Sequence, residues 1–520
     1  MQKKGPIPII DLFAGPGGLG EGFSAVRNKL NKPVFSLKVS IEKDRIAHET
    51  LSLRSIFRRL SQEGTVPESY YDHIRGKISR DEFLKHPDVA HLSTEALSEA
   101  KCAELGKTPH EQIDKWIASG IDGSSDWVLI GGPPCQAYSL AGRSRRTNET
   151  QEKFESDEKH FLYREYLRII KRFGPKVFIM ENVKGMLSSQ HGGSPIFDRI
   201  MSDLSSPGEG LSYEIRSLVV PSAPGTLTPK DFIIEAERFG IPQGRHRVVL
   251  FGVRSDGNSS SAMPKSSRLF TLQPADSHVT VGDVLSGLPR LRSKISRGND
   301  DFKQWLRTLE EAPHLLGGWN PEACEIIASI MKRATSNAYD YETTGASFIP
   351  TALSQEKLTP QLSYWLQDAR IGGVIQHESR GHMRSDLHRY LFASAYAAQF
   401  GVSPKISNFP PKLLPNHGNV NSENVPFSDR FRVQAKDSWS STVVSHIAKD
   451  GHYFIHYDPA QCRSLTVREA ARLQTFPDNY FFAGNRTEQY TQVGNAVPPL
   501  LAYQIARVVA DFINHHDKNV

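Results

Sequence analysis

The chain has 520 residues, of which 38% are hydrophobic and 23% charged, a composition typical of a globular protein and not of a disordered one. This length suffices for two or three domains, and the formal net charge of +6 suits a polyanionic partner. The four cysteines are widely spaced and include no Cys-x-x-Cys pair, which argues against a disulfide framework or a zinc site, so we expect no metal. The first apolar run is too short for a signal peptide or a membrane span, so we expect a cytoplasmic protein without a membrane partner.

Apolar runs along the first half of the chain predict the strands of one sheet. The run 7–13 is apolar enough for a central parallel strand, and a glycine-rich loop follows it. Helical spacing predicts helices over 159–173 and 500–513. Further strands are predicted at 34–41, 127–130, 177–180, 213–220 and 247–253. Because strands alternate with helices, we predict an α/β fold with a doubly wound, Rossmann-like sheet that is covered on both faces.

The regular alternation stops near residues 255–267, which are rich in Ser, Gly and Asn and predict a linker. The stretch that follows mixes amphipathic segments (302–309, 387–400) with Pro/Asn-rich links, which predicts a second, smaller and irregular domain. Thr466 to Glu469 form a capping box, which predicts a helix through Gln474 that is stopped by Pro477. We therefore expect a first domain over 1–285 completed by 485–520, a second domain over 286–462, and a hinge with the capping-box helix over 463–484.

One cysteine stands just past a predicted strand, in Gly131-Gly132-Pro133-Pro134-Cys135-Gln136. Open α/β sheets place their chemistry at strand ends, proline fixes φ, and glycine lets a partner approach the backbone. Most free cysteines are small buried hydrophobic residues. The surrounding residues instead favour a thiol at Cys135 that is presented to a substrate.

The glycine pattern Gly15-x-Gly17-x-x-Gly20 matches the dinucleotide fingerprint, which on its own is a weak signal. NAD and S-adenosylmethionine sites both begin with a strand, such a loop and a helix, so the pattern leaves the cofactor open. Glu42 ends the second predicted strand, where a carboxylate can accept hydrogen bonds from ribose hydroxyls. The alternative for Glu42 is a solvated charge at a strand end.

Three further charged residues stand at predicted strands. Glu181 follows one strand, where a carboxylic acid in a water-poor pocket can stay protonated and donate a hydrogen bond, although such a Glu is more often simply exposed. Arg245 and Arg247 alternate along another strand and should point to the same face, where an anion or a carboxylate must join them. The alternative is an exposed edge strand, but the continuous apolar run 248–251 favours a central one.

These strings together resemble the motifs of the cytosine-5 DNA methyltransferases. In chain order they are Asp11 to Gly20 (the S-adenosylmethionine loop), Pro133-Pro134-Cys135-Gln136 (the nucleophile), Glu181-Asn182-Val183 (the acid), Gln243-Gly244-Arg245-His246-Arg247, Arg463 to Tyr480, and Gln492 to Pro499. The motifs occur in the family's order. The resemblance leaves about 52–126 and 255–462 unaccounted for.

The resemblance implies an enzyme of the bacterial restriction-modification or defence type. It would transfer a methyl group from S-adenosylmethionine to carbon 5 of a cytosine flipped out of specific duplex DNA sites. In this mechanism Cys135 attacks carbon 6 of the ring, and Glu181 protonates nitrogen 3. Arg245 and Arg247 would hold the base oxygen, the neighbouring phosphate and Glu181.

The resemblance also implies the binding residues. Cofactor contacts are expected from Phe13, Ala14, Gly15, Gly17, Gly18, Glu42, Pro134, Asn495 and Val497, with Asp88 as a candidate only for the adenine amino group. DNA contacts are expected from Gln136, Ser139, Arg143 and Gln243, and from Arg384 and Arg389 in the basic stretch 381–390 of the target-recognition domain. The loop around Arg143 and the stretch 381–390 could equally be solvated basic surfaces.

Three alternatives stay open at this point. A transfer RNA cytosine-5 methyltransferase shares these motifs, although the long stretch 255–462 favours double-stranded DNA. An NAD oxidoreductase would explain the glycines but not Cys135, Glu181 and the arginine pair together. A catalytically silent DNA-binding protein would be expected to have lost Cys135 or Glu181. We expect a monomer at the nucleoid that works beside a partner restriction or defence nuclease, and the target sequence cannot be read from the chain.

Overall fold

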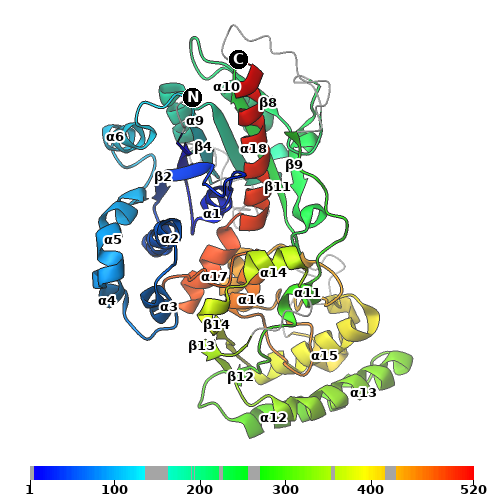
Figure 1. Ribbon diagram of the computed structural model, residues 1–520. Helices are drawn as coiled ribbons and strands as arrows, with labels where there is room; N and C mark the ends of the chain where they lie inside the picture. The colour runs from blue at the N-terminus through cyan, green and yellow to red at the C-terminus, as the bar shows by residue number, and fades with distance from the viewer. Residues whose placement is uncertain are drawn as a thin grey trace.

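The computed structural model describes residues 5–134, 162–188, 190–191, 194–221, 226–255, 270–352, 358–415 and 429–519. Figure 1 shows an upper unit with a central sheet above a second unit that is mostly helical. The carboxyl-terminal helix runs back into the upper unit beside the amino-terminal segment.

The upper unit is built on one mixed sheet in the strand order β3-β2-β1-β4-β5-β11-β8, with β9 also paired to β11. Strands β1 to β5 run parallel to one another, whereas β11 is antiparallel to β5, β8 and β9. The strands are β1 (Ile7–Leu12), β2 (Phe35–Glu42), β3 (Ala100–Cys102), β4 (Val128–Gly131), β5 (Val177–Val183), β8 (Tyr213–Arg216), β9 (Ile233–Glu235) and β11 (His246–Arg254). The predicted strand at 213–220 is therefore shorter than expected, and the others lie close to their predicted places.

Helices cover both faces of this sheet, which confirms the doubly wound α/β prediction. On one face lie α1 (Gly18–Ser24) and α18 (Pro499–Asn519), and on the other α6 (His110–Ile121), α9 (Leu162–Phe173) and α10 (Ile196–Ser205). The two helices of the first face pack so closely that a Cβ atom on Gly22 would lie 2.5 Å from the Ala502 side chain. The carboxyl-terminal helix α18 therefore packs in the same core as β1 and α1.

The final helices also form the one stretch of the described residues, 486–515, that is long and apolar enough to cross a membrane. Most of that stretch is buried inside the protein, where α18 packs on α1 and the sheet. Packing in the core accounts for its apolar composition, since a core helix of a globular protein passes the same test.

The stretch before β3, for which the sequence predicted no role, folds into a helical insertion at the sheet edge. It contains α2 (Arg45–Glu63), α3 (Glu68–Ile74), α4 (Arg80–Lys85) and α5 (Pro87–Glu99). The four helices share a small apolar core that includes Ile56, Tyr70 and Phe83. Ile371 and Ile375, from the second unit, complete this core, so the insertion joins the two units.

The second unit is an irregular assembly of helices and short strands. Its own core is formed mainly by α12, α13 and α15, and includes Trp305, Met331 and Tyr390. Its elements are α11 (Val281–Leu285), β12 (Lys294–Ile295), α12 (Phe302–Glu311), α13 (Pro321–Asn337), β13 (Gly345–Pro350), α14 (Pro360–Leu366), β14 (Gly373–Glu378), β15 (Gly381–His382), α15 (Arg384–Phe400) and β16 (Ser440–Ser441). Residues within 362–374 and 443–454 belong instead to the core on the α1 face of the sheet, so the packing does not follow one boundary at residue 286.

Short elements make the remaining connections. They are β6 (Gln190–His191), β7 (Ser194–Pro195), β10 (Gln243–Gly244), and the 3-10 helices η3 (Lys184–Ser188), η4 (Pro229–Phe232), η5 (Ala236–Phe239), η7 (Ala312–Leu316), η8 (Ala338–Asp340), η9 (Ala369–Ile371), η10 (Ile406–Asn408), η11 (Pro411–Leu413) and η12 (Ser445–Ala448).

Helix α16 (Val467–Leu473) lies between the two units and begins with the predicted capping box. The Thr466 amide donates to Glu469 Oε2 at 2.7 Å, and the Glu469 amide donates to Thr466 Oγ1 at 3.2 Å. Arg463 and Arg472 are buried, but each forms a two-pronged ion pair, with Glu469 and Asp478 respectively. Helix α17 (Arg486–Asn495) then leads into α18.

Two buried histidines beside Glu469 should make the protein sensitive to acid. Burial lowers the pKa of both His377 and His456 from 6.5 to about 4. The unfolded chain binds protons at the ordinary histidine value, whereas the folded chain resists them, so stability is full above pH 6.5 and falls as the pH drops toward 4. We expect a loss of up to about 2 kcal/mol per histidine at pH 5.

Urea unfolding at pH 7 and pH 5 measures this loss. His377→Gln should reduce the difference between the two pH values, because a glutamine can still bridge the carbonyl of Pro289 and the hydroxyl of Thr466 but does not titrate. Equal stability of the wild-type protein at the two pH values would contradict the assignment.

Candidate active site

The glycine loop between β1 and α1 has a backbone that few sequences allow. Gly15 and Gly17 have φ values of +57° and +98°, and Phe13 also has a positive φ of +57°. Only glycine adopts these angles without strain, and at Phe13 the backbone is held by the next residue, since the Ala14 amide donates to Ile41 O at 3.1 Å. The turn at 495–497 meets this loop, because a Cβ atom on Gly18 would lie 2.2 Å from the carbonyl oxygen of Val497.

Glu42 faces the same loop from the end of β2. Its Oε2 accepts a hydrogen bond from the Gly15 amide and its Oε1 one from the Asp44 amide, both at 2.8 Å. Burial is the largest influence on its pKa and raises it. The carboxylate therefore stands half-buried at the loop and is not a solvated strand end.

Asp88, the candidate for the adenine contact, is not on the sheet but lies exposed in the first turn of α5. Strand β3 is parallel to β2 and pairs Cys102 with Glu42. The segment after Cys102 is therefore the one that shares the sheet edge with the glycine loop.

Asp11 is a second carboxylate at this place that the sequence analysis did not single out. It is fully buried in β1, and a Cβ atom on Gly20 of α1 would lie 3.1 Å from its Oδ2. Neither carboxylate oxygen has a hydrogen-bond partner among the described residues, and burial raises its pKa well above the usual range. A charged residue within an apolar central strand is the signal that could have marked it.

The parallel strands β4 and β5 bring the Pro-Pro turn against Glu181. Gly131 pairs with Met180, the residue before Glu181. A Cβ atom on Gly132 would lie 2.9 Å from Glu181 Oε2, so a side chain there would displace the Glu181 carboxylate. Pro134 is the last described residue of this segment, and Cys135, Gln136, Ser139 and Arg143 lie outside the described residues.

Arg247 holds Glu181 in place across β11 and β5. Its Nε lies 2.9 Å from Glu181 Oε1, and both side chains are largely buried. Strand β11 lies between β5 and β8, so it is a central strand, and the alternative of an exposed edge strand is wrong. The structure thus brings together two of the predicted catalytic residues.

Arg245 is fully enclosed next to this pair. Its Nη1 donates to the carbonyl oxygen of Val443 at 2.9 Å and approaches that of Gly494 at 3.5 Å. Burial and the neighbouring Arg247 lower its pKa well below the usual range. These contacts join the segments around Val443 and Gly494 to the site. Arg245 is therefore buried beside Arg247 and does not reach the surface.

Gln243 is a correction to the predicted DNA contacts. Its side chain is 0% exposed, because β10 pairs in parallel with β16. Its Nε2 donates to Leu473 O and Gln474 Oε1, and its Oε1 accepts from the Val443 amide. The side chain uses all its polar atoms to join β10 to α16, so none is left for DNA.

Arg389 is a second correction. Its Nε donates to Leu413 O at 2.8 Å, its Nη1 donates to Asp386 at 3.0 Å, and it covers the ring of Phe431. The residue supports the core of the second unit, because α15 is a core helix with a buried inner face. Arg384 differs, since it lies exposed in the first turn of α15. It is the residue of this pair that is free to contact DNA.

Residues 440–445 reach the site although no sequence pattern marked them. The Thr442 hydroxyl donates to the carbonyl oxygen of Gly244 at 2.6 Å. A Cβ atom on Gly494 would lie 2.2 Å from the Ser445 nitrogen. This segment therefore fills the space between β10 and α17, and only the tertiary structure reveals it.

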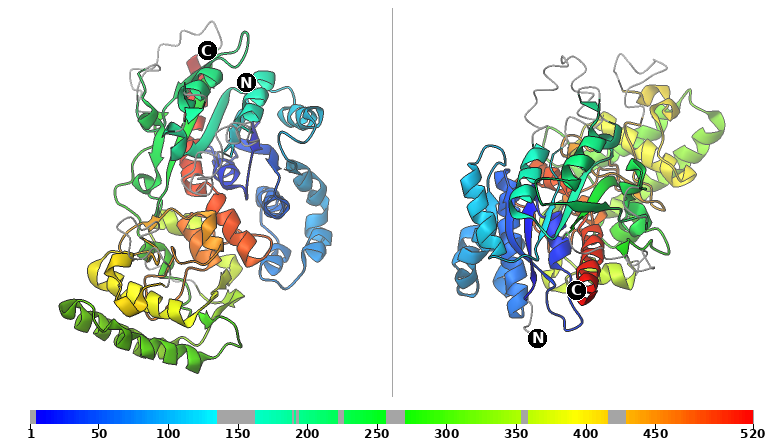
Figure 2. Two further views of the ribbon diagram at one scale, coloured as in Figure 1. Left: turned by 180° about the vertical axis from the view of Figure 1, so that it is seen from behind. Right: turned by 90° about the horizontal axis from the view of Figure 1, so that it is seen from above.

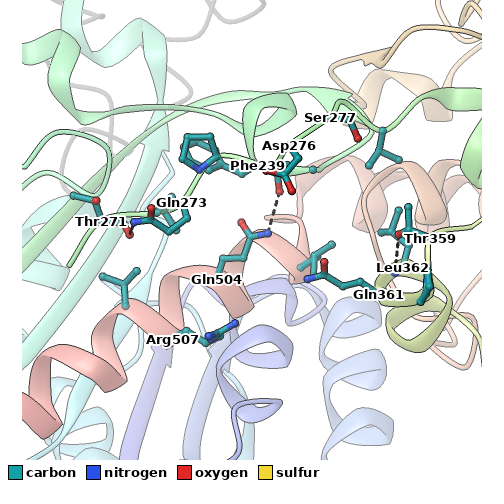
Figure 3. Close-up of a pocket in the computed structure, with 18 of the residues that line it drawn as sticks. Phe239, Thr271, Gln273, Asp276, Ser277, Thr359, Gln361, Leu362, Gln504 and Arg507 are labelled. Carbon is teal, nitrogen blue, oxygen red and sulfur yellow. Dashed lines mark hydrogen bonds between the residues drawn. The ribbon is translucent and has the colours of Figure 1, made fainter. Parts of the chain in front are cut away.

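A groove of about 1000 Å³ lies elsewhere, between η5, the segment 271–279, α14 and α18. Figure 3 shows Gln504 and Arg507 of α18 on one wall and Gln361 and Leu362 of α14 on the other. Gln504 Nε2 donates to Phe239 O at 3.0 Å across it. None of the predicted site residues lines this groove, so it is separate from the candidate active site.

Comparison with known proteins decides the family. The model of the C-5 cytosine-specific DNA methylase family matches residues 98–511. The chain belongs to this family. The methyltransferase is 33% identical to the type II methyltransferase M.Bpa9945I of Bacillus paralicheniformis, over 98% of this chain and 99% of that protein. It is 28% identical to the type II methyltransferase M.AgeI of Thalassovita gelatinovora, over 96% of this chain and 98% of that one.

A solved structure supports the fold. A candidate DNA modification methyltransferase encoded within an E. coli prophage matches with a TM-score of 0.51 and 18% identity, over 98% of this chain and 99% of that one. The methyltransferase is therefore a DNA (cytosine-5-)-methyltransferase of the restriction-modification kind. This assignment decides against the NAD oxidoreductase.

Proposed function

We propose that the methyltransferase uses S-adenosylmethionine to methylate carbon 5 of a cytosine flipped out of specific duplex DNA sites, through a covalent adduct with Cys135. The observation that carries this proposal is the packing of the turn before Cys135 against Glu181, which Arg247 holds at 2.9 Å. A nucleophile and an acid on neighbouring strand ends can act on two atoms of the same ring.

The residues around the glycine loop fit S-adenosylmethionine. Glu42 has lone pairs left for ribose hydroxyls, and the open backbone from Phe13 to Gly17 leaves room for close contact. Among the described residues, the buried carboxyl group of Asp11 has no hydrogen-bond partner, and this suits a ligand with an ammonium group. The Val497 carbonyl beside the amino end of α1 disfavours the pyrophosphate of a dinucleotide.

When bound there, the cofactor supplies a methyl group on a sulfonium centre. The expected contacts are Phe13, Ala14, Gly15, Gly17, Gly18, Glu42, Pro134, Asn495 and Val497. Of these, Asn495 is exposed at the end of α17, and Val497 touches the loop directly. Pro134 connects this surface to the nucleophile.

The chain's own residues would carry the base chemistry. The base leaves the duplex at a cost of a few kcal/mol. The Cys135 thiolate forms a bond to carbon 6, and Glu181 gives a proton to nitrogen 3, so that carbon 5 becomes nucleophilic. After carbon 5 has taken the methyl group, it gives its proton to a base, and the carbon–sulfur bond breaks to return the thiolate. Nitrogen 3 returns its proton to Glu181, so that the base leaves neutral and the acid is restored. Arg247 orients Glu181, and Arg245 supports that pair from behind.

DNA contacts would come from Gln136, Ser139 and Arg143 beside the nucleophile and from Arg384 in the second unit. The enzyme would act as a monomer in the cytoplasm, on nucleoid DNA, with a restriction or defence nuclease as its partner. The type II methyltransferases to which the chain is similar support the restriction setting.

Bisulfite sequencing of DNA from cells that express the protein tests the proposed function. We expect protected cytosines at one recurring sequence, because carbon 5 methylation blocks deamination by bisulfite. Methylation of transfer RNA without any protected DNA cytosine would favour the transfer RNA alternative. DNA without protected cytosines, in cells that contain soluble enzyme, would contradict the proposal.

A further inference from the structure

The helical insertion binds a segment of the second unit through polar contacts as well as through its core. We call residues 64–99, with α3, α4 and α5, the strut, and residues 366–372, between α14 and β14, the docking segment. Arg75 of the strut donates from Nε to the carbonyl oxygen of Ile371 at 2.9 Å. Arg370 of the docking segment donates from Nη1 to the carbonyl oxygen of Val66 at 2.5 Å, and its guanidinium covers the ring of Tyr71 at 4.5 Å.

Asp368 is the centre of these contacts. Its Oδ2 accepts from the Tyr71 hydroxyl and from Asn479 Nδ2, both at 2.8 Å. Its Oδ1 accepts from the Arg370 amide at 3.0 Å and caps η9. One carboxylate thus joins the strut, the docking segment and the segment after α16.

These contacts continue into the upper unit, which carries the candidate active site and is called the catalytic unit from here on. Asn479 Oδ1 accepts from Arg54 Nη1 at 2.9 Å, and Arg54 forms a buried ion pair with Glu21 of α1. Figure 1 shows α3 at the edge of the catalytic unit beside β13 and β14. The docking segment is therefore linked, through Asn479 and Arg54, to α1, the helix that follows the glycine loop.

We propose that the strut sets the orientation of the second unit over the active site, with Asp368 as the positioning residue. This inference rests on the proposed function, in which a duplex must contact both units while one base enters the catalytic unit. Misplacement by about 1 Å can cost about a hundredfold in rate. Asp368 touches neither the catalytic pair Glu181–Arg247 nor the glycine loop, so it acts on DNA recognition through the position of the second unit.

Asp368→Asn tests the role with little change of shape. Asparagine is also a good helix cap and can keep the bond to the Arg370 amide. Its amide nitrogen would then face Asn479 Nδ2, so that two donors meet. Asn479 cannot turn over without losing the bond from Arg54. The double variant Asp368→Asn/Asn479→Asp reverses the polarity of the contact and should restore it, because a tyrosine hydroxyl can accept as well as donate.

The first measurement reads the orientation without needing activity. Spin labels are attached to Cys102, which is exposed on β3, and to Cys324, which is partly exposed on α13, in a Cys135→Ser background. Double electron–electron resonance then measures the distance between the two units. Cys462 is buried and should stay unlabelled. We expect Asp368→Asn to broaden or shift the distance distribution and the double variant to return it to that of the parent.

The second measurement is kinetic. Asp368→Asn should raise the KM for target DNA by about tenfold, as expected for loss of a hydrogen bond to a charged group, and leave the S-adenosylmethionine Kd unchanged. Tyr71→Phe removes only one hydroxyl and should have a smaller effect in the same direction. Tyr339→Phe, which removes an exposed hydroxyl bond to Glu310 within the second unit, is the matched control and should change neither value.

An unchanged distance distribution in Asp368→Asn would overturn the proposal. So would an equal loss of S-adenosylmethionine affinity, which would mean that the contacts serve the cofactor loop. Lack of rescue by the double variant would also count against it. If the wild-type enzyme transferred no methyl group to DNA, the proposed function would fail, while the distance measurement would still decide the role of the strut.

Discussion

Cys135→Ala should abolish methyl transfer and leave cofactor binding intact. Removal of a covalent nucleophile blocks the first bond to carbon 6, and we expect a loss of at least about a thousandfold in turnover. The cofactor contacts lie on the glycine loop and the turn at 495–497, so calorimetry should give the wild-type Kd for S-adenosylmethionine. Cys324→Ala, which removes a thiol on α13 of the second unit, is the matched control and should keep full activity.

A mechanism-based trap gives an independent reading of the same residue. DNA with 5-fluorocytosine at the target should stay covalently attached to the wild-type enzyme, because fluorine cannot leave carbon 5 as a proton does. Cys135→Ala should form no such complex on a denaturing gel. Substantial methylation by the purified alanine variant, or a trapped complex with it, would refute the assignment of the nucleophile.

The catalytic unit could be predicted from sequence because its signals are local. The predicted central strands are apolar runs with a break after them, and the glycine loop has the positive φ values that its composition allows. Strands β3 and β9, which have only three residues each, were not predicted. The Thr466–Glu469 capping box likewise needs only four residues in sequence. Parallel strands carry their carboxyl ends to one edge, so Glu181 and the Pro-Pro turn meet without further information.

The errors concern side chains whose surroundings come from distant parts of the chain. Gln243 belongs to a motif associated with the site, yet β16 and α16, about two hundred residues later, bury it and use its polar atoms. Arg389 stands in a basic stretch, yet Leu413 and Phe431 enclose it. A charge pattern along the chain cannot distinguish an enclosed guanidinium from a free one such as Arg384.

The helical insertion shows a second limit of sequence reasoning. Its helices have ordinary amphipathic patterns, which predict helices but not their packing partner. That partner includes Ile371 and Ile375 of the second unit, which complete the core of the insertion. The position of residues 440–445 could not be predicted for the same reason. They lie beside Gly244 because β16 pairs with β10, which is about two hundred residues earlier in the chain. Non-local pairing of short segments leaves no periodic signal.

Glu181→Gln should reduce turnover far more than DNA affinity. Glutamine keeps the size of the side chain and can still donate a hydrogen bond, but it cannot transfer a proton to the ring nitrogen. Loss of a general acid typically lowers the rate by about 10²–10⁴-fold, and we expect single-turnover methyl transfer to fall within that range. Glu235→Gln, in an exposed ion pair with Arg238 at the strand β9, is the matched control and should leave the rate unchanged.

The contact with Arg247 sharpens this expectation. The amide cannot neutralise a guanidinium that lies 2.9 Å away in the wild-type protein, so Glu181→Gln should also lower the free energy of unfolding modestly. Rapid-quench measurement of one turnover at saturating DNA separates the chemical step from binding. If the variant lost only DNA affinity and transferred the methyl group at the wild-type single-turnover rate, Glu181 would be a binding residue, and the proton would have to come from another group in the pocket.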